Sequence, residues 1–168
     1  MIQNSPETVT IRPARPGEEG LILQMIRELA EYEKLLHEVT ATEEDIRSSL
    51  FSGKPTAEPL LVHVGEKPAG FAIFFHNYST FLGKNGLYLE DVYVRPDYRH
   101  GGIGKAILKH LAGIAKERGC GRFEWAVLDW NEPAIRFYRS MEAQPQNDWT
   151  VYRLDRTGIE SLVSSIRD

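Results

Sequence analysis

The stretch that decides the fold reads Arg99-His100-Gly101-Gly102-Ile103-Gly104 and separates a predicted strand from a predicted helix. The strand is expected over Leu87–Val94, where aromatic and branched residues end at Arg95-Pro96. The helix is expected over Gly102–Arg118, because its apolar residues share one face and Gly119 is a suitable stop. Glycines at a helix entrance let backbone N–H groups approach a diphosphate, which the helix dipole also favours. We therefore interpret this stretch as a phosphate-binding loop.

The flanking sequence predicts a mixed α/β domain. Alternating β-forming residues predict further strands at Thr8–Arg12, Leu60–Val64, Ala69–Asn77, Arg122–Leu128 and Trp149–Leu154. Helical spacing of apolar residues predicts further helices at Gly17–Leu36, Glu43–Phe51, Asn131–Arg139 and Ile159–Ile166. The turn Gly65-Glu66-Lys67-Pro68 predicts an antiparallel hairpin. No repeat, low-complexity segment or linker interrupts the chain, so we expect one domain over residues 1–168.

Composition excludes several classes of protein. The 168 residues are 42% hydrophobic and 10% aromatic, which suffices for a continuous core. No apolar run reaches about 18 residues, and Met1–Thr10 lacks the layout of a signal peptide, so we expect a cytoplasmic protein without a membrane partner. A net charge of -4 without a basic stripe disfavours nucleic acid. The single Cys120 excludes an intramolecular disulfide, and the histidines show no ligand spacing, so we expect no metal.

Two better-known phosphate motifs do not fit the loop. A nucleoside-triphosphate loop needs Ser or Thr after its lysine, whereas Ala106 follows Lys105. A dinucleotide fingerprint needs Gly or Ala where this chain has Ile107. ATP and NAD are therefore disfavoured.

The loop instead resembles the Arg-x-x-Gly-x-Gly signature of the GNAT acetyltransferase superfamily. The resemblance runs from about Val9 to about Asp155 and is closest to the spermidine/spermine and thialysine N-acetyltransferase branch. It is carried by Arg27–Glu33, Leu87–Asp91, the Arg99 loop and Asp129–Tyr138. It implies a GNAT-like acyl-CoA N-acyltransferase fold, with a central mixed, mostly antiparallel sheet flanked by helices. It also implies a homodimer that transfers acetyl from acetyl-CoA to a primary amine.

The resemblance assigns two catalytic residues. An alkyl ammonium has a pKa near 10.4, and holding it neutral at pH 7 costs about 4 to 5 kcal/mol, so a base is needed. Glu90 matches the family glutamate that accepts the amine proton, directly or through water. Tyr138 matches the tyrosine that protonates the departing CoA sulfur. Taken without the resemblance, Glu90 reads as an ordinary strand carboxylate and Tyr138 as a core tyrosine.

The resemblance also assigns the two binding sites. The cofactor is expected at Val92, Tyr93, Val94, Arg99, His100, Gly101, Gly102, Ile103, Gly104, Lys105, Asn131 and Ala134. The three strand residues would offer backbone groups, and Asn131 also fits a helix N-cap. The amine is expected at Tyr32, Glu33, Glu90 and Asp91, because carboxylates and an aromatic face hold an ammonium.

Two departures from the family bear on the substrate and on a turn. Asn147-Asp148 stand where polyamine enzymes have a glutamate before the tryptophan matching Trp149, which weakens the expectation of spermidine. Asp129-Trp130-Asn131 and Glu31–Leu35 resemble the thialysine branch more, which favours a lysine-like amine or short diamine. Glu142-Ala143 replace the usual Gly-Ala after the tyrosine helix, which leaves the local turn open. Two other functions stay open: a protein or peptide N-acetyltransferase, and a non-catalytic acyl-CoA-binding sensor.

Overall fold

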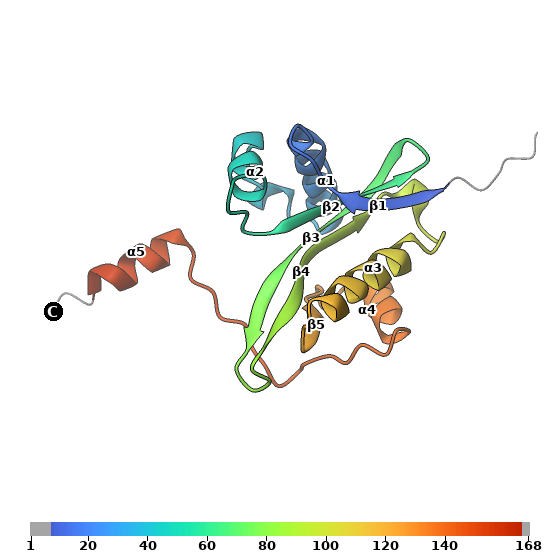
Figure 1. Ribbon diagram of the computed structural model, residues 1–168. Coiled ribbons are helices and arrows are strands. Elements are labelled where there is room, and N and C mark those ends of the chain that lie inside the picture. The colour runs from blue at the N-terminus through green and yellow to red at the C-terminus, as the bar shows by residue number, and fades with distance from the viewer. Residues whose placement is uncertain (1–7, 166–168) are drawn as a thin grey trace, which may run out of the picture. The chain divides into compact units, whose positions relative to one another are not determined.

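The computed structural model describes residues 8–165 and divides the chain into two compact units, residues 1–126 and 127–168 (Figure 1). Residues 1–7, which contributed to the expectation of a cytoplasmic protein, lie outside the described residues, as does Ile166 of the last predicted helix. The single domain over 1–168 stays a prediction.

The first unit is built on one five-stranded sheet in the order β1-β2-β3-β4-β5. Its strands are β1 (Val9–Pro13), β2 (Glu58–Val64), β3 (Lys67–Ser79), β4 (Lys84–Val94) and β5 (Arg122–Trp125). Neighbouring strands are antiparallel except β4 and β5, which are parallel. The mixed, mostly antiparallel sheet expected from the sequence is thus confirmed.

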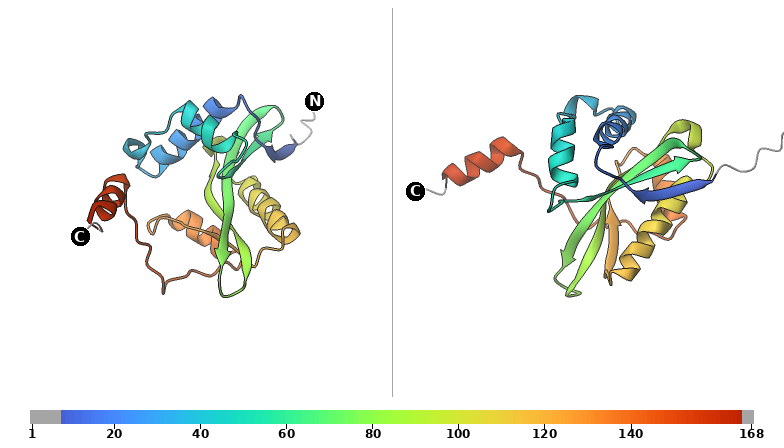
Figure 2. Two further views of the ribbon diagram at one scale, coloured as in Figure 1. Left: turned by 60° about the vertical axis from the view of Figure 1, so that its left-hand side comes forward. Right: turned by 45° about the horizontal axis from the view of Figure 1, so that its top comes forward.

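Helices cover both faces of this sheet. Figures 1 and 2 show α1 (Glu19–Tyr32) and α2 (Glu43–Leu50) on one face and α3 (Ile103–Glu117) on the other. In α3 the buried residues recur at helical spacing, because Ile103, Ile107, Leu111 and Ala115 are each four residues apart. Short 3-10 helices lie at Leu36–Glu38 and Pro96–Tyr98. The helix predicted over Gly17–Leu36 is therefore shorter, because α1 ends at Tyr32.

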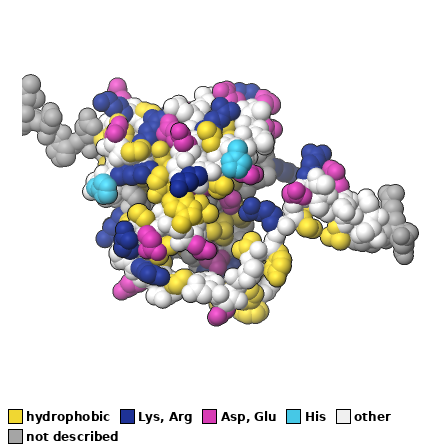
Figure 3. Space-filling view, turned by 180° about the vertical axis from the view of Figure 1, so that it is seen from behind, with side chains coloured by type: hydrophobic (Ala, Val, Ile, Leu, Met, Phe, Trp, Pro, Cys, Tyr) yellow, Lys and Arg dark blue, Asp and Glu magenta, His cyan; other side chains and the backbone are white. Residues whose placement is uncertain are grey.

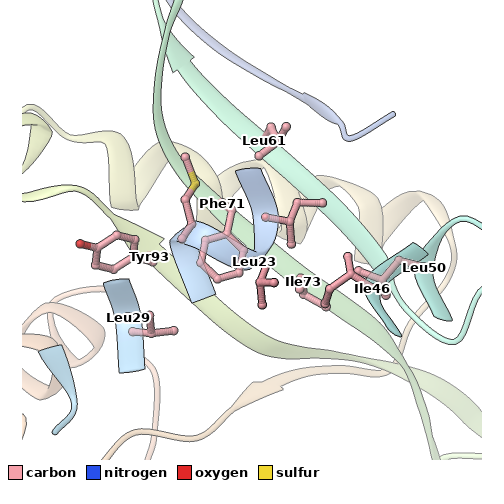
Figure 4. Close-up of a cluster of buried hydrophobic side chains, with 10 residues drawn as sticks. Leu23, Leu29, Ile46, Leu50, Leu61, Phe71, Ile73 and Tyr93 are labelled. Carbon is pink, nitrogen blue, oxygen red and sulfur yellow. The ribbon is translucent and has the colours of Figure 1, made fainter. Parts of the chain in front are cut away.

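The core between α1, α2 and the sheet includes Tyr93, one of the predicted cofactor residues. Figure 4 shows Leu23 and Leu29 of α1 packing toward Phe71 and Tyr93. Full burial of such a side chain contributes about 1.5–3 kcal/mol. Only 7% of Tyr93 is exposed. Its side chain therefore belongs to the core. Only the backbone of Tyr93 is left to contact a cofactor.

An ion pair joins α1 to the end of β4. The carboxylate of Glu28 accepts hydrogen bonds from Nε (2.9 Å) and Nη2 (2.7 Å) of Arg95. Arg95 also donates from Nη1 to the carbonyl oxygen of Pro68 at 2.9 Å. The pair lowers the pKa of Glu28 through the hydrogen bonds from Arg95. Bidentate arginine pairs of this kind add geometric specificity, so the end of α1 is held against β4.

The second unit contains α4 (Glu132–Arg139) and α5 (Arg156–Ser165). The strand predicted at Trp149–Leu154 was wrong, because this described segment forms no strand. A strand needs a ladder partner for its backbone groups, and α4 and α5 offer none. The strand predicted over Arg122–Leu128 was too long, because β5 ends at Trp125, opposite Leu89 of β4.

Surface and helix properties add three observations. None of the helices within residues 8–165 is long and apolar enough to cross a membrane. On the face drawn in Figure 3, basic and acidic side chains are interspersed. Among the described residues no group of three or more His, Cys, Asp or Glu side chains is placed to hold a metal ion.

Candidate active site

A β-bulge at Glu90 lies next to the point where β4 loses its second strand partner. In the β3–β4 ladder Leu89 pairs with Phe74 and Asp91 pairs with Ile73, so Glu90 is skipped. The parallel partner β5 reaches only as far as Leu89. From Glu90 onward β4 therefore pairs with β3 alone among the strands of the first unit. Bulges bend a strand and redirect side chains. Because β5 ends opposite Leu89, no strand of the first unit covers the second edge of β4 at residues 92–94. The cofactor role expected for those residues stays a prediction.

Three carboxylates gather beside this bulge. The pKa of Asp91 is raised from 3.8 to about 6 by burial first and then by the negative charges of Glu90 and Glu33. Glu33 is the C-cap of α1, and burial raises its pKa as well. Carboxylates that repel one another in a partly desolvated site favour the binding of a cation. Three of the four residues predicted to hold the amine are therefore brought together.

The fourth predicted amine residue, Tyr32, is the last residue of α1 and immediately precedes Glu33. It is 37% exposed. An aromatic face beside carboxylates suits an ammonium group. The local chain path therefore places all four predicted residues at the end of α1 or at the bulge of β4.

The glycine loop has the geometry of an anion cradle. Gly102 has φ 78° and is the N-cap of α3, without a side-chain hydrogen bond to the helix. A Cβ on Gly102 would meet no atom within 4 Å, so the space before the helix is open. The first N–H groups of a helix have no partners within it, and the dipole favours an anion there. Ile103, 5% exposed, anchors this end to the core, whereas Gly101 and Lys105 are exposed.

Arg99 contacts protein groups in this structure. Its Nε donates to the carbonyl oxygen of Val94 at 2.8 Å. Its Cζ lies 4.8 Å from the ring centroid of Tyr32 and 5.6 Å from that of Tyr93. His100, the next residue, has φ 67°, a conformation that few residues other than glycine adopt. The predicted contact between Arg99 and a diphosphate stays a prediction.

The remaining predicted residues belong to the second unit. Oδ1 of Asn131 accepts a hydrogen bond from the backbone N–H of Ala134 at 3.3 Å, so Asn131 is the N-cap that the sequence allowed. Tyr138 is half-buried, with its ring 5.5 Å from that of Phe137. The roles of Asn131, Ala134 and Tyr138 toward cofactor and substrate stay predictions.

The turn after α4 keeps the backbone that a glycine would give. Glu142 has φ 63°. The N–H of Ala143 donates to the carbonyl oxygen of Tyr138 at 3.3 Å, a contact typical of helices that end in a left-handed residue. The departure noted in the sequence therefore changes the residue and keeps the turn.

Comparison with known proteins decides the family. The sequence model of the Acetyltransferase (GNAT) family matches residues 23–142. The chain belongs to this family. This acetyltransferase is 39% identical to thialysine N-epsilon-acetyltransferase of Sus scrofa, over 92% of this chain and 97% of the relative. It is 31% identical to L-ornithine N5-acetyltransferase NATA1 of Arabidopsis thaliana, over 90% and 86% respectively.

A solved structure shares this fold. The integron cassette protein VCH_CASS6 of V. cholerae superposes with a TM-score of 0.77 at 26% identity, covering 92% of this acetyltransferase and 97% of that chain. The predicted fold, and an enzyme that transfers acetyl to an amine, are confirmed.

Gly70 of β3 pairs with the part of β4 that β5 does not cover, and the sequence analysis did not name it. It pairs with Val94, and a Cβ added to Gly70 would overlap the carbonyl oxygen of Tyr93. A glycine inside a strand pattern is the signal that was available, because it often marks a close approach of two backbones.

Proposed function

We propose that this acetyltransferase moves acetyl from acetyl-CoA to the primary amine of a small cationic substrate: a thialysine-like or lysine-like amine, a diamine or a polyamine. The observation that carries the proposal is the carboxylate cluster of Glu33, Glu90 and Asp91. The negative charges of Glu90 and Glu33 add to burial in raising the pKa of Asp91, and an ammonium group would offset that cost. The compared relatives are named for thialysine and ornithine, both small amines.

The glycine loop and the open edge of β4 support acetyl-CoA as the donor. The cradle before α3 suits the pyrophosphate, because Gly102 leaves open space in front of the helix. The ladder groups of residues 92–94 suit the amides of the pantetheine arm. Acetyl-CoA would supply an acetyl thioester. The protein's part is to bind it, to remove a proton from the ammonium and to protonate the thiolate.

We assign the two proton transfers as the family pattern implies. Glu90 accepts the proton of the substrate ammonium, directly or through water, and leaves a neutral amine able to attack the carbonyl carbon. The new C–N bond forms as the C–S bond breaks. Tyr138 donates its phenol proton to the departing sulfur, and the proton that the amide nitrogen loses restores the phenol. Asp91 and Glu33 hold the cationic substrate beside Glu90.

A thiol-release assay with acetyl-CoA tests the proposal. The acceptors are lysine, thialysine, ornithine, short diamines, spermidine and a few peptides with free amino groups. We expect saturable release of free CoA with one or more of the small amines. Turnover on peptides alone would indicate a protein or peptide N-acetyltransferase. Binding of acetyl-CoA without turnover on any amine would indicate a non-catalytic sensor, and either result would reject the proposal.

We also propose that the protein is a homodimer. Support comes from the segment that the sequence predicted as a strand: Trp149, Val151 and Leu154 are 75%, 85% and 54% exposed. Exposed β-forming residues of this kind mark a surface that a second chain can cover. Sedimentation equilibrium should give twice the 19.1 kDa of one chain, and Val151→Glu should lower the association. A single 19.1 kDa species at micromolar concentration would refute the dimer.

A further inference from the structure

The side chain of Arg99 connects the glycine loop to the amine side of the candidate site. Its guanidinium lies over the ring of Tyr32, at 4.8 Å from Cζ to the centroid, and near that of Tyr93 at 5.6 Å. Its Nε donates to the carbonyl oxygen of Val94 at 2.8 Å. These partners come from α1 and β4, the two elements that carry the carboxylate cluster. One planar cation therefore touches both.

Tyr32 is the link between Arg99 and the carboxylates. It precedes Glu33, whose charge raises the pKa of Asp91 across the gap between α1 and β4. A guanidinium over the ring limits where that ring, and with it the end of α1, can lie. The hydrogen bond to the carbonyl oxygen of Val94 acts in the same way on the last residue of β4, four residues beyond the bulge. Losing these contacts should loosen the amine site.

We propose that Arg99 is a positioning residue of the amine site, acting through Tyr32 and the backbone of Val94, rather than a ligand of the cofactor pyrophosphate. The inference rests on the proposed function, because it concerns the acceptor of the same reaction. It requires the planar guanidinium and its Nε–H, not merely a positive charge. Lysine keeps the charge and still binds phosphates, but it cannot stack in this way or reproduce the fixed donor geometry.

Arg99→Lys separates the two roles. Acetyl-CoA affinity is measured by titration calorimetry, and steady-state kinetics are measured with the best amine of the thiol-release screen. We expect the Kd of acetyl-CoA to stay within about twofold, and the KM of the amine to rise roughly tenfold with a smaller change in kcat. Lys105→Gln is the matched control, because Lys105 is an exposed cation of the same loop without such contacts to α1. This substitution should raise the Kd of acetyl-CoA and leave the KM of the amine unchanged.

A second donor makes the test independent of phosphate. S-acetylpantetheine carries the acetyl thioester and lacks the pyrophosphate and the nucleotide. The rise in amine KM for Arg99→Lys should persist with this donor, whereas the Lys105→Gln effect should vanish. The inference is overturned if the Arg99→Lys effect also vanishes, or if its acetyl-CoA Kd rises tenfold with the amine KM unchanged.

A double-mutant cycle identifies the route. If Arg99 acts through Tyr32, combining Arg99→Lys with Tyr32→Leu should raise the amine KM scarcely more than Tyr32→Leu alone. Fully multiplicative effects would overturn that route. Absence of acetyl transfer by the unaltered protein would instead reject the proposed function, so the two failures are distinguishable. Thermal unfolding of each variant identifies any loss of folding.

Discussion

Gly70 of β3 and Tyr93 of β4 approach each other so closely that a Cβ on Gly70 would overlap the carbonyl oxygen of Tyr93. The carbonyl oxygen belongs to the backbone, and a Cβ would be fixed to the backbone of a paired strand, so neither could move aside as the end of a flexible side chain would. The contact lies on the part of β4 that β5 does not cover. The absence of a side chain at Gly70 therefore allows the backbone of β4 to follow its observed course at residues 92–94.

Gly70→Ala should destabilise the protein by about 1–3 kcal/mol, because overpacking forces the backbone to shift. It should also weaken the binding of acetyl-CoA, since the backbone shift affects residues 92–94. Gly113→Ala is the control: Gly113 lies in α3 with no atom within 4 Å of an added Cβ. That substitution should stabilise the helix by up to about 1 kcal/mol. Urea unfolding measures both, and equal effects of the two variants would contradict the argument.

Asp91 makes stability depend on pH. Its folded pKa of about 6 lies above the ordinary 3.8, so the folded state binds the proton more tightly than the unfolded state. Stability is therefore highest below about pH 4 for this group and is lost as pH rises through 6. Asp91→Asn should raise the free energy of unfolding at pH 8 by roughly 1–3 kcal/mol, and the gain should vanish below pH 4. Chemical unfolding at both pH values checks this; a pH-independent gain would exclude Asp91 as its source.

Amine binding should follow the same titration with the opposite sense. Protonated Asp91 no longer attracts an ammonium, so kcat/KM for the amine should fall below about pH 6. Glu33→Gln removes one of the charges that raise this pKa, and it should move the acid limb of the profile to lower pH. Carboxyl NMR of Asp91 in both proteins measures the shift directly. An unmoved titration in Glu33→Gln would show that the two carboxylates are not close.

Tyr138 should matter to turnover and not to cofactor affinity. Tyr138→Phe removes only the phenol oxygen, so kcat should drop about 100-fold or more while the Kd of acetyl-CoA is retained. Tyr78→Phe serves as the control, since Tyr78 is 59% exposed on β3 and should leave kcat unchanged. Undiminished turnover by Tyr138→Phe would remove Tyr138 from its proposed role.

Glu142 adopts a left-handed backbone that glycine adopts more easily. Glu142→Gly should therefore stabilise the end of α4 by about 1 kcal/mol. Glu142→Ala loses the carboxylate and keeps the Cβ, so it should change little. Amide hydrogen exchange at Ala143 reports on this turn, because its N–H donates a hydrogen bond to the carbonyl oxygen of Tyr138. A gain of equal size in both variants would point to charge rather than backbone strain.

Local sequence patterns predicted much of the fold because they reflect local physics. The spacing of Ile103, Ile107 and Leu111 identified α3, and Gly119 was correctly read as its stop, with φ 65° in the structure. The same reasoning failed at Trp149–Leu154, because β-propensity does not show whether a partner strand is available. The family motifs, carried by short contiguous segments, were sufficient to predict the acetyltransferase.

The sequence by itself determined which residues are available: a glycine loop at a helix entrance, carboxylates at the end of a strand, and a tyrosine on a short helix. Only the tertiary structure decided how some of them act. The bulge at Glu90, the raised pKa of Asp91 and the stacking of Arg99 on Tyr32 all depend on segments distant in the chain. Register, burial and cation–aromatic contacts arise where such segments meet, so a linear pattern carries no record of them.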